Sequence, residues 1–252
     1  MKNVNTPPLS VNYVIKISLL FFIFSIFTID SYAQKGCGDD CGGTWSSQQQ
    51  IIIPAPNYPN CDIAVFYRTK QCVDNSVQVD ISGWGLINGN CDAFMSTFIT
   101  PWPAVSPITI DQDVLAQIDL EVMRSLGDQL FIDTYNQLPT STQQTLHCPQ
   151  YNPIAQINFE LKSCISYCIS YDRDNPGIVR VTKTPCSETE CCIIKRQHCF
   201  NTQTGQVEAL ETVTTVGNPA CGEGTSVPTC NLPSNHEFLG QTRCTILCGD
   251  EE

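Results

Sequence analysis

Sixteen cysteines constrain the fold of this 252-residue chain more than any other feature of its sequence. The number is even, and the cysteines of an exported chain are normally oxidised in pairs. We therefore expect disulfides throughout, with a connectivity that the sequence leaves open. The candidate disulfide cysteines are Cys37, Cys41, Cys61, Cys72, Cys91, Cys148, Cys164, Cys168, Cys186, Cys191, Cys192, Cys199, Cys221, Cys230, Cys244 and Cys248.

The stretch from Cys186 to Cys199 is the most informative part of this set. Residues 191–200 favour a strand, residues 201–205 form a polar turn with a glycine, and residues 207–216 are rich in threonine and valine. Two such segments around a turn predict a β-hairpin. Successive side chains of a strand point to opposite faces, so Cys191 and Cys192 should bond to different partners.

The first 33 residues have the pattern of a secretory signal peptide. Lys2 and Lys16 precede an apolar and hydroxyl-rich run over residues 17–29, and Ser31 and Ala33 are small residues at the positions that a signal peptidase reads. We predict cleavage after Ala33. The expected location is therefore the periplasm, the outer surface or the extracellular medium.

A membrane anchor and a lipidation site are the two alternatives to a cleaved signal peptide. A membrane anchor is disfavoured because residues 17–29 are fewer than the ~20 residues that span a bilayer. Lipidation of Cys37 is disfavoured because residues 34–36 lack the aliphatic residue of a lipoprotein signal. Cleavage by signal peptidase therefore remains the preferred interpretation.

The predicted mature chain is strongly acidic. Removing Lys2, Lys16 and Asp30 from totals of 13 basic and 25 acidic residues leaves 11 against 24, a net charge of −13. Proteins bind nucleic acids and anionic membranes mainly through their Lys and Arg side chains. We expect no nucleic-acid partner and, after signal cleavage, no membrane partner. With 42% hydrophobic residues the chain can also bury an ordinary core, which the disulfides would reinforce.

Alternation of apolar and polar residues predicts several strands. Residues 61–70 and 77–81 form an expected first hairpin, and residues 91–100 a short apolar strand. Residues 156–171 carry the strongest alternation in the chain and return through a turn at 172–177 into a strand at 178–183. The expected loops are residues 34–60, 83–85 and 88–90, with an irregular, disulfide-held tail from residue 218.

Cys164 and Cys168 lie on one face of the expected strand over residues 156–171. A strand rises ~3.3 Å per residue, which separates the two residues by about 13 Å. A disulfide requires Cα atoms about 4.4–6.8 Å apart. Each of these cysteines must therefore bond to a residue elsewhere.

One helix is expected, at about residues 111–138. Leu115, Ile118, Val122 and Leu126 share a face, and Asp111 suits the position that caps a helix start. Beyond Gly127 the apolar residues move to another side of the helix. We therefore predict a break or kink there and a second short helix that ends near Pro139.

These elements predict a mainly β protein of antiparallel hairpins with a helical insertion, disulfide-rich and α+β overall. Residues 34–252 are expected to form a single disulfide-linked body with two lobes, a β-hairpin lobe over 34–110 and a Cys-rich β lobe over 148–252, joined by a helical segment over 111–147. Five cysteines precede the helix and eleven follow it. If all are paired within the chain, at least one disulfide must join the two groups.

No catalytic motif stands out, and no cofactor is predicted. Zinc is disfavoured because the chain has no Cys-x-x-Cys pair, and the same absence argues against thiol redox catalysis. The calcium-loop pattern from Asp172 fails because Pro176 and Lys183 occupy ligand positions. His147, His198 and His236 are the only candidate histidine bases, and we expect them at the surface. The catalytic residues are therefore left unassigned.

Three aromatic residues lie in glycine- or proline-rich segments, namely Tyr58, Trp84 and Trp102. They suggest either a contact surface for sugar or protein, or caps on the ends of a β core, and we favour the second role. Together these observations predict an exported, disulfide-stabilised, non-enzymatic binding or structural protein of the cell envelope or extracellular space. Its expected partner is a protein or a glycan at the cell exterior. A secreted hydrolase with a site assembled from loops and a metal-binding cysteine protein remain the alternatives.

Overall fold

The computed structural model describes residues 41–87, 91–103, 107–149, 155–175, 178–187, 191–216, 221 and 225–248. The predicted signal peptide and Cys37 lie outside these ranges. The described residues all belong to one compact unit. None of its described helices is both long and apolar enough to cross a membrane.

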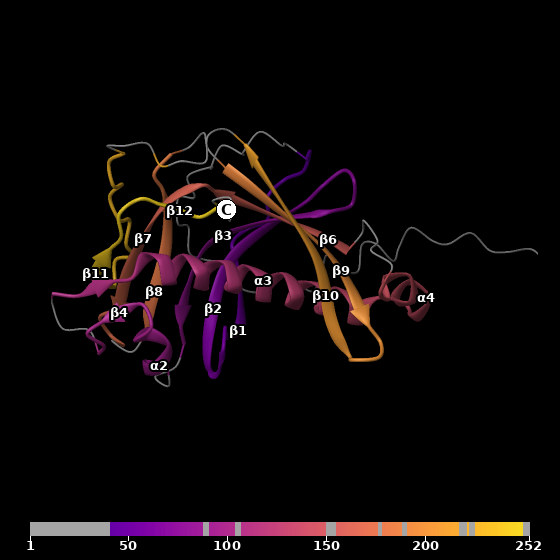
Figure 1. Ribbon diagram of the computed structural model, residues 1–252, viewed down its shortest axis with the longest axis horizontal. Helices are drawn as coiled ribbons and strands as arrows, with labels where there is room; N and C mark the ends of the chain where they lie inside the picture. Colours follow the sequence, from indigo (N-terminus) through magenta and orange to yellow (C-terminus); the bar gives the residue numbers. More distant parts are fainter. Residues whose placement is uncertain are drawn as a thin grey trace, which may run out of the picture. The chain divides into compact units, whose positions relative to one another are not determined.

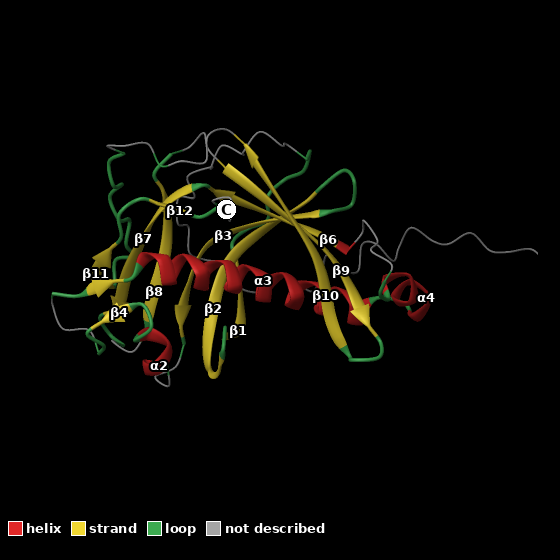
Figure 2. Cartoon of the chain, in the orientation of Figure 1, coloured by secondary structure: helices red, strands yellow, loops and turns green. Residues whose placement is uncertain are grey.

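Strands dominate this unit, which confirms the expected mainly β fold with a helical insertion (Figures 1 and 2). The strands are β1 (Gln49–Ala55), β2 (Tyr58–Gln71), β3 (Val77–Leu86), β4 (Ile99–Thr100), β5 (Thr109–Ile110), β6 (Gln156–Lys162), β7 (Cys164–Asp172), β8 (Val179–Pro185), β9 (Cys191–Asn201), β10 (Gln206–Val216), β11 (His236–Gln241) and β12 (Thr245–Ile246). The helices are α2 (Asp92–Met95), α3 (Gln112–Gln137), α4 (Thr140–Gln143) and the 3₁₀ turn η1 (Gln144–Leu146). All described strands except β4 and β5 join one sheet.

The sheet branches at β3. One edge of β3 pairs with β2 as the predicted first hairpin. On the other edge, Val77–Val79 pair in parallel with β6, whereas Gly83–Gly85 pair antiparallel with β8. Two arms therefore leave the same strand, one through β6, β9 and β10 and the other through β8, β7 and β11.

The predicted loop at residues 83–85 is wrong, because these residues form part of β3. Its glycines allow β8 to approach closely: a Cβ atom at Gly83 would lie 2.3 Å from the carbonyl oxygen of Val181. Trp84 between them is fully buried and belongs to the core. Glycine here indicates close strand packing rather than a turn.

Helix α3 begins as predicted, with the Asp111 carboxylate accepting a hydrogen bond from the Val114 N–H. The predicted break at Gly127 is wrong, since α3 continues to Gln137. A Cβ atom at Gly127 would lie 3.2 Å from the Phe159 ring, so glycine serves close packing there. The apolar face shifts because the helix changes neighbours: Phe131 and Tyr135 stack against His198 and Phe200 of β9.

The single strand predicted over residues 156–171 is divided at Ser163. β6 pairs with β3 and β9, whereas β7 pairs with β8, β11 and β12, so the two segments lie in different arms of the sheet. Alternation cannot reveal this division because Leu161 and Ile165 keep the same parity across it. The polar-looking face of β7 is also buried, including Ser166 and Ser170.

Three further segments differ from the sequence prediction. Residues 49–55 form β1 despite Pro54, since among the described strands β1 is hydrogen-bonded only to β2 and an edge strand tolerates proline. Residues 91–100 contain helix α2 and only a two-residue strand at their end. The tail after residue 218 includes β11 and β12.

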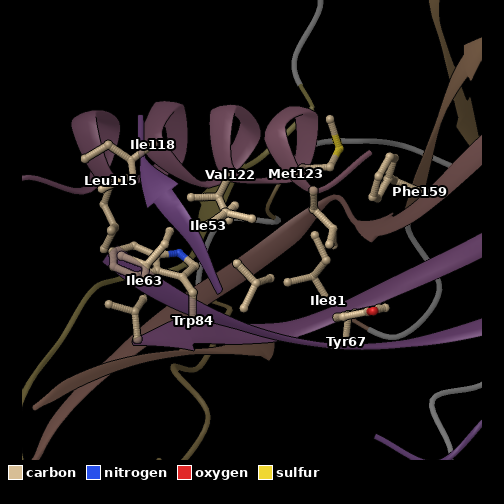
Figure 3. Packing of buried hydrophobic residues seen from close by; sticks show 14 of the residues in the cluster. Ile53, Ile63, Tyr67, Ile81, Trp84, Leu115, Ile118, Val122, Met123 and Phe159 are labelled. Atoms are coloured by element: carbon tan, nitrogen blue, oxygen red, sulfur yellow. The ribbon is translucent and has the colours of Figure 1, made fainter. Parts of the chain in front are cut away.

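The core lies between α3 and the sheet. Figure 3 shows Leu115, Ile118, Val122 and Met123 of the helix facing residues of β1, β2, β3 and β6. Trp84 packs among Phe94 and Phe98, with ring centroids 5.7 and 5.9 Å away. Burial of large aromatic and aliphatic side chains supplies the main stabilisation of such a layer.

Candidate functional site

Disulfides connect strands β7 and β9 to the C-terminal segment. No described cysteine is free, and Cys191 is disulfide-bonded although its partner is not among the described pairs. The predicted separate partners of Cys191 and Cys192, and of Cys164 and Cys168, are confirmed. The described pairs are Cys41–Cys72, Cys61–Cys91, Cys148–Cys199, Cys164–Cys221, Cys168–Cys230, Cys186–Cys244 and Cys192–Cys248.

This pairing bears on two expectations. The predicted disulfide between the cysteines before and after the helix is not among the seven described pairs. The sulfur atoms of Cys164, Cys186 and Cys244 lie within 4.8 Å of one another, a spacing that could suit a metal. Each belongs to a disulfide, so none offers the thiolate that binds zinc.

His198 is completely buried, so its predicted surface position is wrong. Its Nδ1 donates to the carbonyl oxygen of Ala155 at 3.2 Å, its Nε2 lies 3.3 Å from the Asp128 carboxylate, and Phe131 stacks on the ring. The C-terminal half of α3 covers this histidine. His147 Nε2 lies 2.9 Å from the Tyr135 hydroxyl. Within the described residues, neither His147 nor His198 is hydrogen-bonded to a serine.

His236 does contact a serine, with Nδ1 3.0 Å from the Ser170 hydroxyl. It also lies opposite Asp172 in the pairing of β11 with β7. Burial and the nearby Arg180 lower the pKa of His236, while Asp172 opposes that shift. Ser170 is completely buried, so its hydroxyl cannot attack a substrate, and the contact stabilises the attachment of β11.

A charged cluster joins α3 to the β9–β10 hairpin, and its members are Arg124, Asp128, Arg196, His198 and Glu211. Glu211 accepts two hydrogen bonds from Arg124, at 2.9 and 3.1 Å. Arg196, with an 8% exposed side chain, lies 3.0 Å from Asp128 and 3.3 Å from Glu211. The hydrogen bonds from Arg124 lower the pKa of Glu211, and the charge of Arg196 adds to this effect.

A second charged group lies inside the core and consists of Asp119, Tyr167 and Lys183. Lys183 Nζ is 3.1 Å from Asp119 Oδ2, and the two side chains are 9% and 1% exposed. Tyr167, which pairs with Lys183 across β7 and β8, is fully buried. Burial and the Asp119 carboxylate together raise the pKa of Tyr167 well above its ordinary value.

The sequence prediction missed both charged groups. Asp119 could have been noticed, because it follows Ile118 and lies four residues after Leu115, within the apolar face of α3. A carboxylate at such a position requires a buried partner. Which cation supplies it depends on the pairing of β8, which no local pattern reveals.

Two shallow grooves lie on the surface of the described residues. We call the first the Tyr58 groove: it has a volume of about 460 Å³ and lies between the turn after β1 and helix α3. Tyr58 and Pro54 line one side, whereas Ser125, Asp128 and Gln129 line the other. The second groove, of about 570 Å³, lies between the segments around Ile110 and Leu239.

The three aromatic residues that suggested a contact surface differ in their positions. Trp84 is fully buried in the core, so it is not part of a contact surface. Tyr58 is half-buried and packs on Phe94 at 5.5 Å between centroids, and Trp102 donates a hydrogen bond from Nε1 to Asp92 at 2.8 Å. Of the three, only Tyr58 lines either of these two grooves.

Comparison with known proteins adds no relative: no family model, no curated protein and no solved structure matches this chain. The geometry of the described residues is therefore the basis for any functional conclusion.

Proposed function

We propose that this protein is an exported, disulfide-stabilised, non-enzymatic binding or structural protein of the cell envelope or extracellular space. The observation that carries the proposal is the oxidised state of every described cysteine, because such a set of disulfides forms and persists outside the reducing cytosol. Each disulfide typically contributes ~2–4 kcal/mol to stability.

The surroundings of His198 and His236 support a role without catalysis. His198 is enclosed by protein groups, and the serine beside His236 is inaccessible. A nucleophile and its base must both reach a substrate. In the described residues these side chains instead hold α3 and β11 in place.

Export is tested by producing the whole chain in a bacterial host and analysing cell fractions. The expected product is found outside the cytoplasm, begins at Gln34 and takes up no alkylating reagent before reduction. An intact protein retained in the cytoplasm, or one with many reactive thiols after export, would contradict the proposal.

Binding is proposed at the Tyr58 groove, with a glycan or an extended protein segment as the partner. The support is an aromatic ring beside polar side chains, an arrangement that suits amphipathic ligands. The assay is a glycan array, followed by a peptide array, probed with the labelled mature protein. Ser125→Trp should fill the groove and abolish a signal given by the wild type.

The matched control is Gln117→Trp, which places the same ring on an exposed position of α3 outside the groove. This variant should bind like the wild type. Equal binding by both tryptophan variants would place the contact surface elsewhere. Turnover of an arrayed glycan or peptide, seen as loss of the spot with time, would favour the hydrolase alternative.

A further inference from the structure

Asp119, Tyr167 and Lys183 place an amine, a carboxyl group and a hydroxyl together in the core. Lys183 Nζ lies 3.1 Å from Asp119 Oδ2, and this oxygen is bonded to the carboxyl carbon that the amine would attack. Asp119 Oδ1 and the Tyr167 hydroxyl have no well-formed hydrogen bond within the described residues. Asp119 Oδ1 and the Tyr167 hydroxyl are therefore available to take part in a reaction.

This group cannot act on an external substrate. Asp119 is 1% exposed, Tyr167 is fully buried, and none of the three residues lines either of the two grooves described above. The chemistry open to it is internal. We propose that Lys183 and Asp119 condense to an isopeptide bond between β8 and α3.

The reaction balances without an oxidant, a reductant or a cofactor. Transfer of a proton from the ammonium to the carboxylate gives a neutral amine and a neutral acid. The Lys183 nitrogen lone pair attacks the carboxyl carbon of Asp119 and forms the C–N bond. The Tyr167 hydroxyl relays one of the two remaining amine protons to the departing hydroxyl, the C–O bond breaks, and one water molecule leaves. The other proton stays on the new amide nitrogen.

Two physical effects favour the amide. A buried pair of charges is costly to keep away from water, and condensation replaces both charges with one neutral amide. The fold also holds the reacting groups in contact, which corresponds to an effective concentration of up to about 10⁵–10⁸ M in well-oriented intramolecular reactions. Free in dilute water, the same amine and acid would lack this effective concentration.

The position of the bond agrees with the distribution of the disulfides. No cysteine occurs between residues 92 and 147, so α3 contains no cysteine, whereas β7 contains two and β9 contains three. Because β8 pairs with β3 and β7, a bond from Lys183 would attach the helix directly to the cross-linked sheet. It would supply the covalent link that α3 otherwise lacks.

The test is mass spectrometry of the folded mature protein after reduction and alkylation. The expected mass is lower than the sequence mass by one water molecule. A tryptic digest should then show no cleavage after Lys183 and should contain the peptide ending at Arg124 joined to the peptide that includes Lys183. Cyclisation of an N-terminal Gln34 would remove ammonia instead, and peptide mapping separates the two.

Three variants make the result specific. Lys183→Arg keeps a cation for Asp119 but should show the full sequence mass. Asp119→Asn should lose ammonia instead of water on forming the same amide. Tyr167→Phe, which keeps the packed ring, should slow the loss of water after refolding by at least tenfold.

The wild type alone decides whether the proposal stands, even if a variant fails to fold. A folded wild-type protein that keeps its full sequence mass during prolonged incubation overturns the proposal. So does a loss of water that peptide mapping assigns to residues other than Lys183 and Asp119.

Discussion

Glu211 offers the sharpest test of how α3 is held to the β9–β10 hairpin. Its carboxylate accepts two hydrogen bonds from Arg124, at 2.9 and 3.1 Å, and lies 3.3 Å from Arg196 Nε. Glu211→Gln keeps the shape of the side chain but removes its charge. The amide can then accept a hydrogen bond at one atom only, and Arg196 retains Asp128 as its ion-pair partner.

The expected loss of stability follows from the exposure of each partner. Arg124 is 46% exposed, so its pair with Glu211 contributes within the surface range of ~0.2–1 kcal/mol. Arg196 is only 8% exposed, and a charge-assisted contact at such a site contributes about 1 kcal/mol or more. Together these give a decrease of roughly 1–2 kcal/mol in the free energy of unfolding at pH 7. The melting temperature should fall by roughly 2–8 °C for a chain of this size.

The pH dependence gives a second readout of the same contact. Its arginine partners lower the pKa of Glu211 from its ordinary value of 4.5. A carboxyl whose pKa is lowered by folding adds stability that is fully present above the ordinary pKa and is lost as the pH falls through the lowered one. The difference between the wild type and Glu211→Gln should therefore be constant from pH 7 to about 5 and shrink in stronger acid.

Urea denaturation with the disulfides intact, repeated at several pH values, measures both effects. Glu208→Gln is the matched control on the same strand, because Glu208 is exposed and, within the described residues, accepts a side-chain hydrogen bond only from Asn201, at 2.6 Å. We expect it to change stability by less than about 0.5 kcal/mol. The reasoning is refuted if the two variants are equally stable, or if the deficit of Glu211→Gln persists unchanged in strong acid.

Three further predictions concern other parts of the fold. Because folding lowers the pKa of His236, the unfolded chain binds more protons than the native chain in mild acid. The free energy of unfolding should therefore decrease as the pH falls below about 6.5. In urea titrations, His236→Gln should weaken this pH dependence. Trp84→Ala should cost about 3–5 kcal/mol by leaving a cavity beside Phe94 and Phe98, whereas a cost below about 1 kcal/mol in calorimetry would mean that the site collapses around the gap. Gly83→Ala should lower the melting temperature because its Cβ would lie 2.3 Å from the Val181 carbonyl oxygen, and an unchanged value would show that β3 and β8 can move apart freely.

The sequence by itself determined the local elements and the need for disulfides. Period-two alternation located the β2–β3 hairpin, and two strand-favouring runs around a polar turn located the β9–β10 hairpin. The Asp111 cap and the apolar face after it located α3. The spacing of Cys164 and Cys168 was enough to show that each bonds elsewhere, because a strand has a fixed rise per residue. These conclusions depend only on backbone geometry and on neighbouring residues.

Only the tertiary structure decided which segments meet. Gly83 and Gly127 resemble breaks in the sequence, yet both allow a close approach by another element. The division at Ser163 leaves the alternation of the flanking residues unchanged, so only strand pairing reveals it. The partner of Asp119 lies 64 residues away along the chain, and the nearest ion-pair partner of Glu211 lies 15 residues away. A buried carboxylate indicates that a cation is required, but not which residue provides it.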